Sequence, residues 1–392
     1  MRWFKTVAAA LVLWIPAAAW AAGNGNLNLV LLEWDDDPRY RERAVEARFP
    51  AQPWGRPYAG AAVAVKEARF AMSAAGTKLE LERRAVTSAD QAGQLFRERY
   101  GQGVRIFLLD LPAVMVAGIA ALSDQQPALL FNVSALDDAL RQEQCHKNLF
   151  HTAPSRSMLT DALAQYLVFK KWRDLLVLKG SQQGDAEYYR AFQRSAKRYG
   201  LKVEAEKDFV LGRDPRQRSQ NNVALLTAGE DYEVVYVVDS QGEFARDVPY
   251  QVQKPRPVVG AAGLVADWWH WAWERHGAPQ VNKRFLKREN RPMTGYDWSA
   301  WMAVKVITEA VLRTRSSELS ELRDYIRGGE ITLDGVKGYP LNFRSWNNQL
   351  RQPVFLTTGN WVVAQAPLEG FLHQSNNLDT LGFDQRENRC KL

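Results

Sequence analysis

The sequence predicts an α/β protein built from two doubly wound lobes. Short aliphatic runs that suit buried strands alternate with stretches whose apolar residues recur at helical spacing, and several of those stretches end at a glycine. The alternation runs to about residue 131 and starts again at residue 158. Because these units are too many for one compact sheet, we expect two parallel sheets, each covered by helices on both faces.

In the first half of the chain the strands and helices follow one another closely. We expect strands at residues 27–32, 79–85, 104–109 and 128–131. The helices between them are expected at residues 58–75, 89–100 and 114–122, and Gly76 and Gly101 end the first two.

The pattern then repeats and later changes character. We expect helices at 158–171 and 186–199, and strands at 174–178, 203–209, 234–238 and 258–260. Two more helices follow at 298–313 and 319–327, and short β-like pieces are expected at 331–333, 341–343, 354–357 and 361–364. A polar, irregular tail begins at Pro367.

Residues 267–275 contain four tryptophans. On a helix, Trp268 would share a face with Trp271, and Trp269 with Trp273. We expect one pair to pack in the core or hinge. The other pair either packs there too or stacks on an aromatic ligand.

The N-terminus has the layout of a cleavable secretory signal. Arg2 and Lys5 precede an apolar stretch at 7–20, and Ala19-Trp20-Ala21 offers small residues at the positions that a signal peptidase reads. The alternative is a membrane anchor, but the apolar stretch is shorter than the ~20 residues that span a bilayer. We therefore expect cleavage near Ala21, a periplasmic location, and a mature chain of 371 residues.

Charge and cysteine content narrow the class of protein. The formal net charge of +7 is spread along the chain rather than gathered in one block, so nucleic acid is not an expected partner. In an oxidising compartment Cys145 and Cys390 are a candidate disulfide that would tie the tail to the first lobe; the alternative is two unpaired thiols.

The sequence contains no enzyme motif that survives inspection. It has neither a phosphate-binding glycine loop nor a Gly-x-Ser-x-Gly elbow, and its five histidines lack zinc-ligand spacing. We expect a protein that is not an enzyme, with no cofactor and no bound metal.

Polar residues follow the predicted strands, and this position is informative. In parallel α/β sheets, ligands bind beyond the carboxyl ends of the strands. The candidate ligand-binding residues are Trp34, Asp35, Asp36, Asp110, Asn132 and Ser134 in the first lobe, and Ser181, Gln183 and Asp239 in the second.

The acidic residues Asp35, Asp36, Asp37 and Asp110 would lie at one edge of the first lobe. Several carboxylates together favour a cationic, polyhydroxylated or metal-associated ligand. The alternative is a solvated acidic loop whose charges are met by Arg39 or Arg41.

The chain resembles the leucine/isoleucine/valine-binding family of type I periplasmic receptors. The stretches that carry the resemblance cover nearly all of the mature chain: residues 27–32, Gly60 to Glu67, Asn148 to Ser155, Asp174 to Tyr189 and Gly295-Tyr296-Asp297. Three C-terminal stretches resemble the branch associated with pyrroloquinoline quinone-dependent alcohol dehydrogenase systems: Gly338 to Trp346, Gln349 to Val354 and Leu378 to Gly382.

The resemblance implies two lobes joined by a three-crossover hinge that closes on a ligand. It also implies a monomeric substrate-binding component of an ABC importer, which docks on a permease in the inner membrane. The alternative is a sensor or accessory protein of a quinoprotein alcohol dehydrogenase. The implied lobes are residues 22–152 with 264–328 and residues 153–263 with 329–366, and residues 367–392 form the tail.

The resemblance also bears on the ligand site and adds Tyr296 to the candidates. The family holds an amino acid's carboxylate with hydroxyl and backbone groups after the third and fourth strands. Ser134 fits that role and Asp110 does not. Gln183-Gly184 stands where the family often has Tyr-Gly, which argues against an ordinary branched-chain amino acid.

Overall fold

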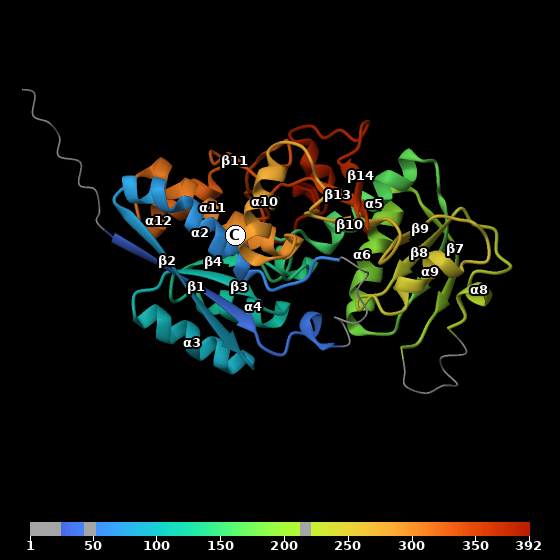
Figure 1. Cartoon of the computed structure of the whole chain (residues 1–392), viewed down its shortest axis with the longest axis horizontal. Coiled ribbons are helices and arrows are strands. Elements are labelled where there is room, and N and C mark those ends of the chain that lie inside the picture. The colour runs from blue at the N-terminus through green and yellow to red at the C-terminus, as the bar shows by residue number, and fades with distance from the viewer. Residues whose placement is uncertain (1–24, 43–51, 212–220) are drawn as a thin grey trace, which may run out of the picture.

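The computed structural model describes residues 25–42, 52–211 and 221–392. The predicted signal peptide lies outside these residues. Figure 1 shows two groups of helices and strands side by side, one from the blue, teal and orange parts of the chain and one from the green and yellow parts. Each group contains a parallel sheet, as the alternating pattern predicts.

The first sheet has five parallel strands: β1 (Gly25–Trp34), β2 (Thr77–Val86), β3 (Ile106–Asp110), β4 (Leu129–Asn132) and β5 (Leu149–His151). Their order is β2-β1-β3-β4-β5. Alternate residues of β1 supply two different cores. Leu29 and Leu31 pack in the cluster that contains α2 (Tyr58–Ala74) and α11 (Gly295–Thr314). Val30 and Leu32 pack against α3 (Ala89–Gly101) and α4 (Ala113–Leu122). The sheet is therefore covered on both faces.

The second sheet has the order β7-β6-β8-β9 and is also parallel. Its strands are β6 (Asp174–Lys179), β7 (Lys202–Asp208), β8 (Val234–Val238) and β9 (Val258–Gly260). α5 (Arg156–Phe169) and α6 (Gln183–Tyr199) share a core with one face. The short helices α8 (Val223–Leu226) and α9 (Val248–Gln251) cover the other. The predicted fold class, two doubly wound α/β lobes, is confirmed.

Later elements return to each lobe. α10 (Ala278–Glu289), α11, α12 (Leu319–Arg327), β11 (Leu333–Asp334) and β12 (Pro340–Leu341) belong with the first core. The antiparallel sheet of β10 (Val265–Asp267), β13 (Val354–Thr358) and β14 (Trp361–Ala366) contributes mainly to the core of the second lobe.

Up to the end of β14 the described chain passes between the lobes three times, between β5 and α5, after β10, and before β13. Leu333, Phe343 and Leu350 pack in the first core, so we propose that the third crossing lies at residues 351–353. The lobe boundaries inferred from the sequence stay a prediction.

Most of the helices and strands lie within a few residues of their expected places, and two local interpretations are wrong. Residues 268–275 form turns rather than a helix, so the tryptophans do not pair by helical spacing. Instead the neighbours Trp268 and Trp269 are both buried in the first core, while Trp271 and Trp273 are half-buried. The sequence reading also missed α10.

The cysteines form a disulfide, Cys145–Cys390, which attaches the tail to the loop before β5. Within the described ranges, no helix is long and apolar enough to cross a membrane.

Candidate ligand site between the lobes

Both sheets reverse their strand order at one point, and loops diverge there. The reversal lies between β1 and β3 in the first sheet and between β6 and β8 in the second. Beyond the carboxyl ends of strands at such a switch point, the diverging loops leave a crevice in which ligands bind. The candidate site is therefore the pair of loops after β1 and β3 together with the pair after β6 and β8.

Arg39 connects the two loops of the first lobe. It lies on the short 3₁₀ helix η1 (Pro38–Tyr40), which Asp37 caps by accepting a hydrogen bond of 2.9 Å from the Arg39 N–H. The same carboxylate accepts two bonds from the Arg39 Nε, and Arg39 Nη2 donates to Asp110 Oδ1 over 2.5 Å. Asp110 is fully buried at the end of β3. One guanidinium thus neutralises carboxylates from both loops.

Tyr296 packs on this ion pair. Its ring centroid lies 4.4 Å from the Arg39 guanidinium carbon. Tyr296 is held in place by the start of α11, where Thr294 and Asp297 form a capping box and Asp297 binds Arg291 over 2.7 Å. Burial raises the pKa of the Tyr296 hydroxyl, and the charge of Arg39 opposes the rise. The phenol therefore stays protonated at neutral pH.

Arg156 provides a charge from the second lobe. It starts α5, and its Nη2 lies 3.1 Å from Glu187 Oε2 on α6. Its Nη2 also lies 3.9 Å from Asp137 Oδ2, in the loop after β4 of the first lobe. Arg156 therefore lies where the lobes face each other.

Three charged side chains at this place each keep a buried atom without a hydrogen-bond partner in the described part of the chain. The atoms are Arg39 Nη1, Asp110 Oδ2 and Arg156 Nε. An unsatisfied buried polar group costs about 1–3 kcal/mol, and more when charged. Nine further atoms of this kind lie elsewhere in the described residues, so it is the position of these three beside the loops that face the other lobe, and not the missing bond alone, that suggests a ligand.

The second lobe uses Asp239 differently from the sequence-based prediction. Its two carboxylate oxygens accept four backbone N–H bonds, from Gln241, Gly242, Phe244 and Ala245. It thereby shapes the loop after β8. Ser181 is exposed in the loop after β6, and exposed Gln183 opens α6 with its amide 3.3 Å from Glu187. Their role in binding a ligand stays a prediction.

The first lobe uses Asn132 in the same structural way. Its Oδ1 accepts from the N–H groups of Ser134 and Ala135, and its Nδ2 lies 2.8 Å from Ala135 O and 3.1 Å from His151 Nδ1. Asn132 therefore organises the loop after β4. The nearby Ser134 is buried, and its hydroxyl makes no hydrogen bond within the described residues.

The acidic loop after β1 is largely neutralised. Asp36 pairs with Arg41 over 2.7 Å at the surface, and the backbone carbonyls of Trp34 and Asp35 accept bonds from Arg56. Exposed Asp35 and half-buried Trp34 remain at the rim of the site. Across the described ranges, no three His, Cys, Asp or Glu side chains are grouped so as to hold a metal ion. The geometry thus gives no support to the metal-associated ligand and favours the paired acidic loop.

His151 gives a pH-dependent prediction at the first crossing. Burial lowers the pKa of His151 well below its usual range, and the charge of Arg141 lowers it further. Below pH ~6.5 this histidine binds a proton in the unfolded chain but not in the folded protein. The free energy of unfolding therefore decreases as pH falls, by up to ~1.4 kcal/mol per pH unit. Urea unfolding between pH 7 and 5 should show that slope reduced in His151→Gln and unchanged in His276→Gln, whose side chain is exposed. Equal slopes in all three proteins would refute this assignment.

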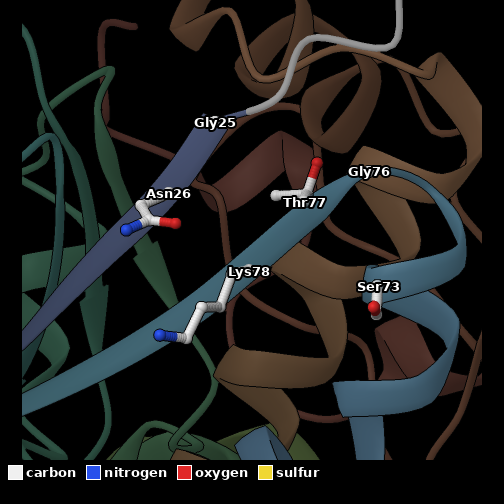
Figure 2. Close-up of a pocket in the computed structure, with 6 residues that line it drawn as sticks. All are labelled: Gly25, Asn26, Ser73, Gly76, Thr77 and Lys78. Atoms are coloured by element: carbon white, nitrogen blue, oxygen red, sulfur yellow. The ribbon is translucent and has the colours of Figure 1, made fainter.

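A surface hollow elsewhere in the first lobe is not part of this site. Figure 2 shows the residues that line it: Gly25, Asn26, Ser73, Gly76, Thr77 and Lys78. These residues lie at the amino ends of β1 and β2. The hollow is therefore at the opposite edge of the sheet from the switch point.

Two residues central to the site, Arg39 and Arg156, were not among the sequence-based candidates. Arg39 had been considered only as a partner that neutralises the acidic loop. Its position, two residues beyond the acidic run that follows β1, was the available signal. The 71-residue separation from Asp110 hid the pairing.

Solved structures with the same fold span nearly the whole chain. An ABC transporter substrate-binding protein from Sphaerobacter thermophilus matches with a TM-score of 0.72 and 15% identity, over 92% of this chain and 100% of that one. A solute-binding protein of an ABC transporter from R. palustris, in complex with benzoate, matches with 0.69 and 12%, over 94% and 100%. The leucine-, isoleucine-, valine-, threonine- and alanine-binding protein from Brucella ovis matches with 0.68 and 13%, over 85% and 89%.

The sequence itself is distant from characterised proteins, since no curated protein matches it. A family model does match: the periplasmic binding protein model covers residues 36–235, which include the switch-point loops of the first lobe, β6 and the start of β8. The chain belongs to the periplasmic binding protein family.

Proposed function

We propose that this protein is the periplasmic substrate-binding component of an ABC importer, and that it takes a small ligand between its lobes by hinge closure. The observation that carries the proposal is the set of unpartnered charged atoms on Arg39, Asp110 and Arg156, which come from both lobes: Arg39 and Asp110 lie at the switch point of the first sheet, and Arg156 starts α5 beside the first crossing. A ligand that meets groups of both lobes stabilises the closed state, which the permease then recognises.

The chemistry of these atoms describes the ligand. Arg39 Nη1 and Arg156 Nε are donors that suit a carboxylate or similar acceptor, and Asp110 Oδ2 is an acceptor that suits a hydroxyl or amine. We infer a small acid that carries a neighbouring hydrogen-bond donor. Supporting this, two matched proteins are described with acids bound, one with benzoate and one with 3,4-dihydroxybenzoic acid.

A thermal-shift screen with matched pairs of compounds tests the proposal. Lactate would be compared with propionate, leucine with 4-methylpentanoate, and 3,4-dihydroxybenzoate with benzoate. A ligand that binds only the folded state raises the melting temperature, by an amount set by its concentration over Kd. We expect a rise for one pair, larger for the member that carries the extra donor. No rise with any acid, and a rise with metal ions instead, would contradict the ligand assignment.

A second candidate is an accessory or sensor role beside a quinoprotein alcohol dehydrogenase. The C-terminal stretches that resemble that branch favour it, in particular Leu378 to Gly382. Affinity capture with purified dehydrogenase would separate the two roles. A stoichiometric complex without a small ligand supports the accessory role, and its absence supports the importer.

A further inference from the structure

We propose that residues 377–390, here called the strap, form a fourth connection between the lobes and restrain their relative motion. The strap contains the 3₁₀ turns η4 (Asn377–Thr380) and η5 (Gln385–Glu387). Figure 1 shows the red C-terminal part of the chain running along both groups of elements. The inference depends on the two-lobed fold and needs no particular ligand.

The strap straddles both hydrophobic cores. Leu378 is buried in the cluster of the first lobe, whereas Leu381, three residues later, is buried in the cluster of the second. Between them, Asp379 is fully buried and accepts hydrogen bonds from Arg344 and Arg351, beside the third crossing. Any rotation of one lobe against the other must therefore move this segment.

A polar anchor fixes the strap to the second lobe. The N–H of Gly382 donates to Asp161 Oδ2 on α5 over 2.7 Å, and the Gly382 carbonyl accepts from Arg198 on α6 over 2.7 Å. Arg194, also on α6, bonds to the same carbonyl over 2.9 Å and pairs with Glu387 over 2.8 Å. Hydrogen bonds in which one partner is charged are stronger than those between neutral groups. This end is therefore strong but reversible.

A covalent anchor fixes the other end to the first lobe. Cys390 is bonded to Cys145, in a loop whose neighbour His146 pairs with Asp124 just beyond α4. Arg389 adds a backbone bond of 2.8 Å to Gln142 and an ion pair of 3.0 Å with Glu143. Because this end cannot release, the lobes can swing apart only as far as the strap and its second-lobe anchor allow.

The part of the strap between its two anchors is short. From Gly382 to Cys390 the chain advances eight residues, which span at most about 28 Å even when fully extended. The hydrogen bonds at both ends keep part of this segment from extending fully, so the actual span is smaller. Cutting the covalent anchor leaves the core contacts of Leu378 and Leu381 in place but frees the last residues. The expected result is a wider range of lobe orientations in the ligand-free protein.

Distance measurements between the lobes test the inference. Spin labels would be attached through ketone-bearing amino acids at Gln94 on α3 and at Tyr250 on α9, both exposed and one in each lobe. This chemistry leaves the cysteines untouched. In Cys145→Ser/Cys390→Ser we expect a broader distance distribution whose mean shifts by more than about 2 Å, a change typical of hinge motion. Glu309→Gln, which breaks an exposed ion pair with Arg313 on α11, is the matched control and should leave the distribution unchanged.

A second measurement guards against misfolding of the serine variant. Wild-type protein would be measured before and after reduction with a phosphine, with the thiols capped and their number verified by mass spectrometry. Broadening on reduction supports the strap. Superimposable distributions from fully reduced and oxidised protein would overturn it. Because no ligand is present, this outcome is independent of whether the importer function is right.

Discussion

Asp379→Ala is expected to cost about 3–5 kcal/mol of unfolding free energy, the usual price of removing one partner of a buried ion pair. Asp379 is fully buried, and its Oδ1 lies 2.8 Å from Arg344 Nε and 2.9 Å from Arg351 Nε. Arg344 is only 1% exposed, and burial lowers its pKa against the opposing effect of Asp379. Without the carboxylate, a guanidinium remains in the core with only backbone carbonyls as partners. Urea unfolding at constant salt would measure the loss.

The controls for this prediction separate burial from charge. Asp36→Ala removes a carboxylate whose ion pair with Arg41 is at the surface, and it should cause no measurable change. The double variant Asp379→Leu/Arg344→Met replaces the buried pair by apolar side chains of similar size and should recover much of the stability, because half-buried Arg351 can turn to solvent. If Asp379→Ala lost no more than Asp36→Ala, the buried pair would not be the source of stability that we infer.

Local pattern was enough to predict the fold, because the central strands of both sheets are almost wholly apolar and buried. β8 reads Val-Val-Tyr-Val-Val and is buried at every residue, as a central strand of a doubly covered sheet must be. The bounds expected for β8 and β9 coincide with the observed ones. The prediction failed at the Trp-rich segment, where a high content of apolar residues was taken as evidence for a helix. The Trp-rich segment has enough apolar residues for a helix, yet its side chains are buried by turns that fold against α11, where Trp268 Nε1 donates to Gly295 O.

The site could be predicted only in part, because polarity after a strand does not say what a side chain binds. Asn132, Asp239 and Asp110 are all candidates because each is a polar residue at or just after the end of a strand. Asn132 and Asp239, however, accept hydrogen bonds from the backbone of their own loops. Asp110 differs because its partner comes from another loop and leaves one oxygen without a bond. That distinction depends on contacts between residues distant in sequence, which a single sequence does not display.

The C-terminal stretches that carried the narrower resemblance have a physical reason to occur together. Residues 338–346, 349–354 and 378–382 are separate in the sequence, but Arg344 from the first and Arg351 from the second both bind Asp379 from the third. Their joint presence is what a buried ion-pair network requires, since any one charge without the others would be strongly unfavourable. Together these three stretches fasten the strap beside the third crossing.

Arg39→Gln is expected to weaken ligand binding by roughly 10- to 150-fold, the equivalent of losing one charge-assisted hydrogen bond of about 1.5–3 kcal/mol. Arg39 Nη1 is the donor that we assign to the ligand's acid group, and its position is fixed by Asp37, Asp110 and the ring of Tyr296. Titration of tryptophan fluorescence with the acid that raises the melting temperature most would measure the loss. Arg41→Gln, two residues along the same loop and paired with exposed Asp36, should bind as the wild type does.

The single variant also leaves the Asp110 carboxylate buried without its cation, so lost binding could follow from a disturbed fold. The double variant Arg39→Gln/Asp110→Asn removes both charges and keeps side chains that can hydrogen-bond to each other, and we expect it to recover thermal stability. It still lacks the positive charge, so its affinity for the acid should stay at least tenfold below that of the wild type, by loss of the charge-assisted bond. A double variant that is stable and binds the acid as tightly as the wild type would show that Arg39 only neutralises Asp110. A double variant that is stable but binds weakly even the paired acid without the extra donor, which makes no bond to Asp110, would identify Arg39 as the residue that selects for acids.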